Sequence, residues 1–221
     1  MVPMPVLGAL SNRRVTDLSC SDVHTMACTS DGDVYAWGSN RYGQLGAPLS
    51  LSVKSSPRRV DGLKKAAVVA VACAVKHSVA LGSDGTVYCW GSNDAGQLGQ
   101  ATAGNALNPN PMPVSKLETF GSSQGSRMRA YAVDAGEECT CVIARKEGGA
   151  GCGISSQVAV FCFGYGDDNP RRIKFEPEKV SRRTARATPD AFPVTKCRLA
   201  HTSLPFLTAN TTLLCAGGGR R

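Results

Sequence analysis

The sequence predicts an all-β protein made of β-propeller-like tandem blades of antiparallel strands, about four blades, forming an incomplete or open propeller. Three observations predict this class. One segment recurs without a gap at an offset of 53 residues. Each copy carries two short apolar runs around an Asp-Gly pair, which is a strong short-range signal for a β-hairpin. No window has the 3.6-residue period of a long amphipathic helix.

The two clear copies of the repeat run from His24 to Gly46 and from His77 to Gly99. Their sequences are HTMACTSDGDVYAWGSNRYGQLG and HSVALGSDGTVYCWGSNDAGQLG. Three or four strands in a unit of roughly 50 residues are typical of a propeller blade. The structural signature of the repeat consists of His24, Asp31, Gly32, Trp37, Gly38, Gly43, Gln44 and Gly46 in the first copy and of His77, Asp84, Gly85, Trp90, Gly91, Gly96, Gln97 and Gly99 in the second.

Two weaker copies follow the clear ones. The third has Cys139 at the histidine position and Phe163 at the tryptophan position, on either side of a Gly-rich insert. The fourth runs from Cys197 to Gly217, with His201 at the histidine position and Ala216 at the tryptophan position. The chain therefore contains four copies, of which the last two have diverged.

A Pro-x-x-Val pattern precedes each copy, and we interpret it as the opening of the unit. It begins at Pro3, Pro57, Pro111 and Pro177. With these openings, the repeats span about 3–46, 57–99, 111–166 and 177–217 in a single repeat domain, 1–221.

Three local patterns predict the strands and turns inside a unit. The Asp31-Gly32 and Asp84-Gly85 pairs predict hairpins with type I′ turns. The apolar run Val68–Val75 is typical of a strand buried on both faces. The sequence Gly-Gln-Leu-Gly closes each clear copy with a glycine-rich turn.

The composition is that of a folded chain with an excess of positive charge. Hydrophobic residues make up 42% of the 221 residues, and the formal net charge is +8. This charge favours acidic partners without identifying one. The longest apolar run, Ala66–Val75, is too short for a membrane-spanning helix, so we expect no membrane association.

The ten cysteines do not predict a disulfide framework. Cysteines that recur at the same place in each repeat are typical of small core residues, and no Cys-x-x-Cys pair provides zinc-site spacing. Cys139 and Cys141 point to one face of a strand, where a redox pair is the alternative to core packing. We expect reduced, unpaired cysteines and a cytoplasmic or nuclear protein. The recurring positions are Cys20, Cys73 and Cys197, each four residues before a histidine, and Cys89, Cys162 and Cys215, late in their repeats.

No motif predicts catalysis, and we expect no cofactor and no metal. His24, His77 and His201 occur once per repeat, too far apart to share a metal, so we interpret them as buried histidines that bridge backbone groups. Trp37 and Trp90 could contact a partner, but we interpret them as residues packed between blades. The Gly-Gln-Leu-Gly turns lack the Lys-Ser/Thr pair and the helix of a phosphate-binding loop.

Two features are candidates for partner binding. One loop slot holds Arg41-Tyr42 in the first copy but Asp94-Ala95 in the second. The segment Asp167–Arg186 is strongly basic, which indicates either a solvated loop and edge strand or a surface for phosphate or an acidic protein. It lacks the interleaved aromatic residues that bind single-stranded nucleic acid, so nucleic acid is not the partner we expect, although the charge does not exclude it. The candidate residues are Arg41, Tyr42, Arg171, Arg172, Lys174, Arg182, Arg183 and Arg186.

The string His-x7-Gly-x-Val-Tyr-x-Trp-Gly-x-Asn-x-x-Gly-Gln-Leu-Gly, present twice, resembles the signature of the regulator of chromosome condensation repeat family. The resemblance implies a β-propeller of four-stranded blades. Family propellers have about seven blades, whereas this chain has four copies. The chain is therefore a fragment, a part of a ring that another chain closes, or a set of degenerate blades that curl more tightly.

The function that we expect is a non-enzymatic scaffold that mediates protein–protein interaction through its blade loops. The sequence does not identify the protein partner. The alternative, implied by the resemblance alone, is guanine-nucleotide exchange on a small Ran-type GTPase together with chromatin association. A non-functional product is a third interpretation, suggested by the diverged fourth copy.

Overall fold

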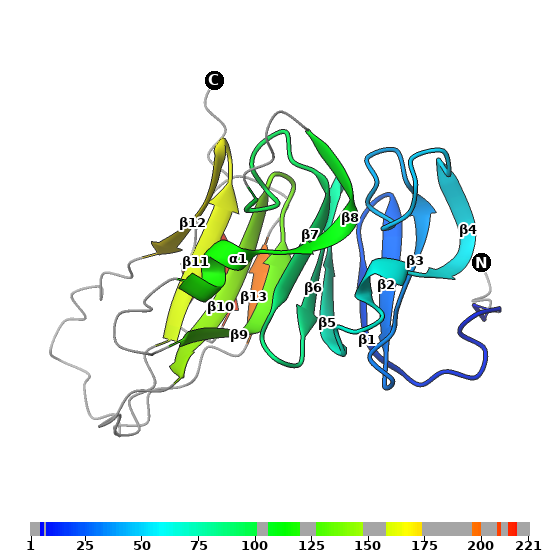
Figure 1. The fold of residues 1–221 in the computed structure, drawn as a ribbon, viewed down its shortest axis with the longest axis horizontal. Coiled ribbons are helices and arrows are strands. Elements are labelled where there is room, and N and C mark those ends of the chain that lie inside the picture. The colour runs from blue at the N-terminus through cyan, green and yellow to red at the C-terminus, as the bar shows by residue number, and fades with distance from the viewer. Residues whose placement is uncertain are drawn as a thin grey trace, which may run out of the picture.

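The computed structural model describes residues 5–6, 8–100, 106–119, 127–147, 158–173, 196–199, 207–208 and 212–215. These residues form three four-stranded antiparallel sheets and one three-stranded sheet, which confirms the all-β prediction. The three four-stranded sheets stand side by side in an open row (Figure 1). No helix in this part of the chain is long and apolar enough to cross a membrane.

Each four-stranded sheet is a meander in which strands that are consecutive in the chain are neighbours in the sheet. We call these sheets blades 1, 2 and 3. Blade 1 consists of β1 (Val15–Cys20), β2 (His24–Thr29), β3 (Val34–Ser39) and β4 (Val53–Arg59). Blade 2 consists of β5 (Val68–Cys73), β6 (His77–Gly82), β7 (Val87–Ser92) and β8 (Leu107–Pro113). Blade 3 consists of β9 (Arg127–Ala135), β10 (Cys139–Glu147), β11 (Val158–Gly164) and β12 (Asp167–Ile173).

The Pro-x-x-Val segments at Pro57 and Pro111 lie at the ends of blades, not at their starts, whereas Pro3 and Pro177 lie outside the described residues. Pro57 lies in β4 and Pro111 in β8, the outermost strands of blades 1 and 2. A short helix follows each strand, η1 (Asp61–Leu63) after β4 and α1 (Ser115–Thr119) after β8. Proline is tolerated on an edge strand because one side of that strand has no ladder to donate to. The pattern thus closes a sheet where we expected it to open one, since a period does not specify where each sheet begins.

The Asp-Gly turns are not of the expected type I′. Gly32 and Gly85 have φ angles of +77° and +86°, whereas the aspartates before them are not among the residues with positive φ. The Gly32 amide donates to Thr29 O at 2.8 Å, as in a type I turn followed by a left-handed glycine. Type I′ turns belong to two-residue hairpin loops, whereas Thr29 N donates to Asp33 O at 3.0 Å around a loop of three residues. A type I turn followed by a left-handed residue is usual in loops of this length.

Adjacent blades have the same orientation. Asp17 Oδ2 accepts a hydrogen bond from Val71 N at 2.8 Å, and Ser19 Oγ accepts one from Cys73 N at 3.0 Å. In both pairs the partners are 54 residues apart, so β1 and β5 lie side by side and run in the same direction. Equivalent connections therefore lie at the same end of the row. We call the end with the β1–β2, β3–β4 and equivalent connections the signature face, and the opposite end the turn face.

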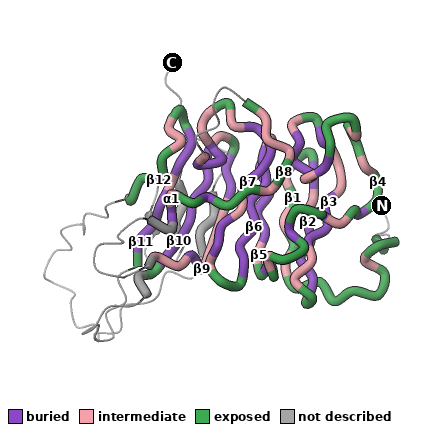
Figure 2. Tube along the Cα trace, viewed as in Figure 1, coloured by how far each residue is buried: buried purple, intermediate pink, exposed green. Residues whose placement is uncertain are grey.

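The hydrophobic core lies between the blades. Alternate residues of β6 show this arrangement, since Ala80 packs against blade 1 whereas Val79 and Leu81 pack against blade 3. Figure 2 shows the buried residues concentrated along the central strands of each blade. The core between blades 1 and 2 includes Met26, Cys28, Val34, Ala36, Ala80 and Trp90, and that between blades 2 and 3 includes Val79, Leu81, Cys89, Val142, Phe161 and Phe163.

Strand β5 is less buried than the apolar run Val68–Val75 predicted. It ends at Cys73, and Val69 is 50% exposed. The pairing of β5 with β6 shifts between Val68 and Ala70, as at a β-bulge, and this shift accompanies the outward position of Val69.

The two tryptophans occupy the same slot but differ in burial. Trp90 is fully buried, and its Nε1 donates to Gln44 O of blade 1 at 2.9 Å. Phe163, in the same slot of blade 3, is buried against Gly99 of blade 2. Trp37 is only partly buried, because none of the described sheets precedes blade 1. The tryptophan slot is thus a contact made with the preceding blade.

The fourth copy does not form a fourth antiparallel meander in the described residues. β13 (Lys196–Leu199) pairs with β15 (Thr212–Cys215) in parallel, and β14 (Leu207–Thr208) pairs with β15 on its other side. β13 lies against β9 and β10 of blade 3. His201 and Ala216, expected at the repeat positions, lie outside the described residues.

Replacing Trp90 with alanine should lower the free energy of unfolding by about 3–5 kcal/mol, as for other buried aromatic truncations. Trp37→Ala is the matched control, and its loss should be smaller because water already reaches the ring. Urea unfolding followed by far-UV circular dichroism measures both. Equal losses for the two variants would contradict the position of Trp90 between blades.

Candidate functional site

The signature histidines join each blade to the next. His24 and His77 are the first residues of β2 and β6, and both are buried. His24 Nε2 lies 2.8 Å from Ser78 Oγ in blade 2, and His77 Nε2 lies 2.9 Å from Thr140 Oγ1 in blade 3. We expected these histidines to bridge backbone groups, but their partners across the junction are hydroxyl groups.

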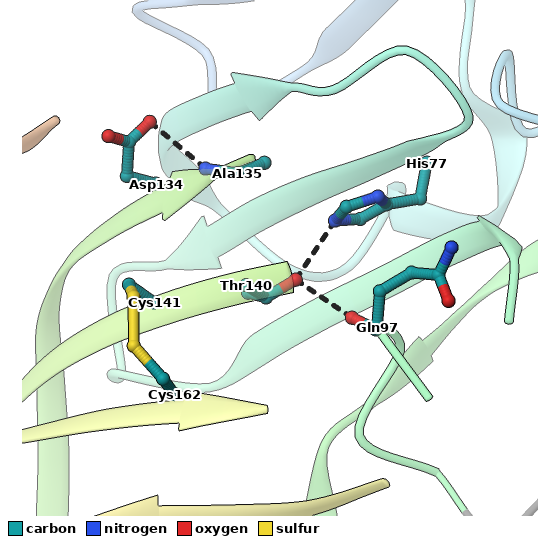
Figure 3. The surroundings of a disulfide bond; sticks show 7 residues. All are labelled: His77, Gln97, Asp134, Ala135, Thr140, Cys141 and Cys162. Atoms are coloured by element: carbon teal, nitrogen blue, oxygen red, sulfur yellow. Dashed lines mark hydrogen bonds between the residues drawn. A yellow bond between two sulfur atoms is a disulfide. The ribbon is translucent and has the colours of Figure 1, made fainter. Parts of the chain in front are cut away.

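The two hydroxyl groups in turn donate hydrogen bonds to backbone carbonyl groups. Ser78 Oγ donates to Gln44 O at 2.8 Å, and Thr140 Oγ1 donates to Gln97 O at 2.8 Å (Figure 3). Because each hydroxyl proton is used in this way, each hydroxyl oxygen accepts from the histidine Nε2–H. We call this chain of histidine, hydroxyl and glutamine carbonyl the blade latch. It occurs once at each of the two junctions.

Burial keeps the latch histidines neutral. Burial lowers the pKa of His24 to about 4, and burial followed by the nearby His24 lowers that of His77 to about 3. Ser21 Oγ lies 3.1 Å from His24 Nδ1, whereas the buried His77 Nδ1 has no hydrogen-bond partner in the structure. In the described part of the chain, no group of three or more His, Cys, Asp or Glu side chains could hold a metal.

The signature glutamines brace the loops that follow β3 and β7. Gln44 Oε1 accepts from Tyr42 N at 2.9 Å, and its Nε2 donates to Val75 O of blade 2 at 3.4 Å. Gln97 Oε1 accepts in the same way from Ala95 N at 2.9 Å. Both glutamines are buried. They hold the loop backbone and are not available to a ligand.

The signature glycines allow close contact between backbones. A Cβ atom on Gly43 would lie 2.8 Å from Pro109 Cα, and one on Gly96 would lie 2.8 Å from the backbone of Asp167 and Asp168. These contacts place each loop against the outer strand of the next blade. The glycines with positive φ in this part of the signature are Gly38, Gly43 and Gly46 in blade 1 and Gly91, Gly96 and Gly99 in blade 2.

Exposed and half-buried side chains on the signature face form a basic aromatic group at the junction of blades 1 and 2. The guanidinium of Arg41 lies 5.8 Å from the centre of the Tyr42 ring, and Lys76 Nζ, from blade 2, lies 5.9 Å from it. We call Arg41, Tyr42 and Lys76 the basic junction. Two cations on one ring leave their hydrogen-bond donors available to a negatively charged partner.

The equivalent positions at the next junction carry the opposite charge. Asp94 and Ala95 stand in the place of Arg41 and Tyr42, and Glu138 stands in the place of Lys76. The backbone shows this equivalence, since Lys76 O accepts from Ser92 N and Glu138 O accepts from Tyr165 N. Each donor comes two residues after the tryptophan slot of its blade. We call Asp94, Ala95 and Glu138 the acidic junction.

Tyr165 lies beside the acidic junction. Its backbone amide donates to Glu138 O at 3.0 Å. Burial, a hydrogen bond with Cys139 and the nearby acidic side chains, Glu137 included, raise the pKa of Tyr165. The hydroxyl therefore stays protonated and adds no charge to this junction.

The basic segment at the end of blade 3 is only partly described. Arg171 and Arg172 lie on β12, the outermost strand, and are exposed. Arg171 forms an ion pair with Asp167. The structure places these residues on a different blade from Arg41 and Tyr42. The other candidates, Lys174, Arg182, Arg183 and Arg186, lie outside the described residues.

Blade 3 carries a disulfide that we did not predict. Cys141 and Cys162 face each other across β10 and β11, with 4.4 Å between their Cα atoms, and are bonded (Figure 3). The expectation that all cysteines are unpaired is wrong for this pair. The same cross-strand position holds Met26–Ala36 in blade 1 and Val79–Cys89 in blade 2, so only blade 3 has a cysteine on both strands. Aligning both strands of each hairpin in the sequence would have found it. The free cysteines in the described residues are Cys20, Cys28, Cys73, Cys89 and Cys139.

A family model described as the regulator of chromosome condensation (RCC1) repeat matches residues 31–81 and 84–143. A second model with the same description matches residues 15–44 and 68–97. Together they cover blades 1 and 2 and reach into β10.

The similar proteins are much longer than this chain. Human probable E3 ubiquitin-protein ligase HERC3 is 32% identical over 174 residues, which cover 76% of this chain and 15% of HERC3. Human probable E3 ubiquitin-protein ligase HERC6 is 35% identical over 113 residues, which cover 51% of this chain and 11% of HERC6. Human E3 ubiquitin-protein ligase HERC2 is 38% identical over 110 residues, which cover 49% of this chain and 2% of HERC2.

Similar solved structures share the β-propeller fold. Prp20p from Saccharomyces cerevisiae, described with its binding properties to Gsp1p and histones, matches with a TM-score of 0.52 and 21% identity over 74% of this chain and 39% of that one. Human WBSCR16 matches with a TM-score of 0.52 and 19% identity over 74% of this chain and 54% of that one. At these identities the match shows the fold alone.

Stability should fall on mild acidification because of the latch histidines. Their pKa is lowered in the folded protein, so stability is fully present above the unfolded pKa of 6.5 and is lost as the pH falls towards about 4 for His24 and about 3 for His77. Each histidine should contribute a loss of about 1.4 kcal/mol per pH unit in this window. Urea midpoints from pH 7 to 4.5 measure the slope. The variant His77→Gln should reduce this slope by the contribution of one histidine. An unchanged slope would contradict a buried, neutral His77.

Peptide mapping should find the disulfide. Because Cys141 and Cys162 are opposed across two paired strands, alkylation of the unfolded, unreduced protein should leave these two joined. Cys162→Ser is the control, and it should make Cys141 reactive. Alkylation of both residues in wild type purified without reductant would show that the pair is reduced.

Proposed function

Because the chain belongs to the regulator of chromosome condensation (RCC1) repeat family, we propose that it acts as a non-enzymatic scaffold that binds a protein partner through the loops of its signature face. One observation carries this proposal. At equivalent loop positions, the buried residues keep the same roles in both clear repeats, whereas the exposed residues change in charge and in aromatic character. A rigid frame with dissimilar exposed loops is the usual architecture of a binding surface.

The buried positions support the frame. Gln44 and Gln97 make equivalent contacts with the backbone of their own loops. His24 and His77 form equivalent latches at successive junctions. These residues have no exposed polar atoms to offer to a partner, so recognition falls to the exposed neighbours.

The buried thiols of the blades give no support to thiol chemistry. Burial raises the pKa of Cys73 to about 12 and also raises that of Cys28 and Cys139. The thiolate is the reactive form of cysteine, and a raised pKa depletes it at neutral pH. We therefore propose that any transfer reaction of a longer protein containing this unit takes place elsewhere, and that these blades recognise a partner.

Charge reversal on the signature face should abolish capture of the partner. The test compares the double variant Arg41→Glu/Lys76→Glu with wild type in a pull-down from cell extract, quantified by mass spectrometry. The control is Arg58→Glu/Lys65→Glu, which makes the same change of net charge at exposed positions towards the turn face. Proteins bound specifically by wild type should fall at least tenfold with the first variant and remain with the control.

A different outcome would place the surface elsewhere. If the first variant retains every protein that wild type binds, the signature face is not the interaction surface. A third variant, Arg171→Ser/Arg172→Ser, tests the described part of the basic segment. A loss confined to that variant would move the binding surface to β12.

Guanine-nucleotide exchange is the second candidate, and it makes a separate prediction. The chain should accelerate release of a fluorescent guanine nucleotide from a Ran-type GTPase. An acceleration of tenfold or more that is lost with the signature-face variant would favour exchange activity over simple scaffolding. An unchanged release rate favours the scaffold.

A further inference from the structure

We propose that the signature face binds a protein segment of divided charge, with an acidic stretch over the basic junction and a basic stretch over the acidic junction. This inference rests on the proposed function and specifies the chemistry of its partner. It follows from the two junctions being equivalent in position and opposite in charge.

The basic junction is suited to carboxylate groups. Arg41 and Lys76 lie on one aromatic ring, and neither forms an ion pair within the described part of the chain. Arg41 is exposed and Lys76 is half-buried, which reduces the hydration that a carboxylate must displace at the lysine. Arginine offers paired donors that match the geometry of a carboxylate.

The acidic junction is suited to lysine or arginine. Asp94 and Glu137 are exposed, and Glu138 is half-buried. Gly166 N donates to Ala95 O at 2.8 Å, which joins the loop of blade 2 to the turn of blade 3. The carboxylates therefore lie on a fixed backbone and do not extend from a free loop.

A buried glutamine holds the loop of each junction through the same contact with a backbone amide. Gln44 fixes the amide of Tyr42 and reaches Val75 O, next to Lys76. Gln97 fixes the amide of Ala95, next to Asp94. Fixed charges lose less conformational entropy when a partner binds, so they contribute more of their attraction to affinity.

The arrangement disfavours a polyanion. A nucleic acid that lies over the basic junction and continues along the row meets Asp94, Glu137 and Glu138 one blade further on. Like charges in close apposition repel, and such pairs exclude wrong partners. A partner of divided charge satisfies both junctions.

The test uses labelled synthetic peptides and the full chain. The first peptide has four glutamates, a three-residue Gly-Ser-Gly spacer and four lysines. The spacer spans about 10 Å when extended, which is close to the separation of two packed sheets. The comparison peptides have only the glutamate block, only the lysine block, or the same residues in alternating order. A short DNA duplex is the polyanion. Fluorescence anisotropy measures binding at low salt, where exposed charges are least screened.

The divided peptide should bind at least tenfold more tightly than any comparison ligand. Arg41→Glu/Lys76→Glu and Asp94→Lys/Glu138→Lys should each weaken it at least tenfold, whereas Arg58→Glu/Lys65→Glu should not. Combining the first two pairs exchanges the charges of the junctions. The quadruple variant should recover binding, because the peptide can lie in the reverse direction. A purely structural role for these residues cannot produce this recovery.

Three outcomes would overturn the proposal. If the glutamate peptide or the duplex binds as tightly as the divided peptide, the acidic junction takes no part. If the quadruple variant folds, as its circular dichroism and urea midpoint show, but does not recover binding, the two junctions do not act as a pair. If no peptide binds while the signature-face variant still loses partners from extract, the scaffold function stands and the divided-charge partner is wrong.

Discussion

The hydrogen bond that a buried histidine donates to a hydroxyl group of the next sheet is the constraint on which the rest of this structure depends. A sheet covered by side chains can slide on its neighbour, because apolar contact is not directional. The latch removes that freedom, since His24 Nε2, Ser78 Oγ and Gln44 O must meet within hydrogen-bond distance. A net contribution of about 1 kcal/mol is usual for one such bond, so its main effect is on register.

The latch also explains how the repeat changes along the chain. At the junction of blades 1 and 2, Gln44 O accepts hydrogen bonds from both Ser78 and Trp90. At the junction of blades 2 and 3, the tryptophan slot holds Phe163, and Gln97 O accepts from Thr140. Blade 3 itself has Cys139 in place of the histidine, so it cannot offer the same donor to the sheet beyond it. That next sheet is where the meander order of the strands is lost.

The sequence was sufficient for the repeat, the class of fold and the burial of His24, His77 and Trp90, because these depend on periodicity and on local pattern. The latch partners could not be predicted, since Ser78 and Thr140 are ordinary strand residues until the sheets are stacked. The disulfide was missed because Cys141 and Cys162 lie in different strands, and only the hairpin register places them opposite each other. The charge of the basic junction could be predicted only in part. Lys76 belongs to the next blade and approaches Arg41 and Tyr42 only when the two blades pack together.

The Pro-x-x-Val strand has a consequence for anyone who wishes to excise or transplant a blade. A cut immediately before Pro57 or Pro111 follows the sequence period but removes the end of the outermost strand from the sheet that it completes. Val60 N and Val114 N donate to Val34 O and Val87 O, so these valines still belong to the preceding sheet. The natural seams lie in the connections after Val60 and Val114, where the backbone leaves one sheet and enters the next. A shuffled or shortened array cut at these points would contain complete sheets, each with its whole outermost strand.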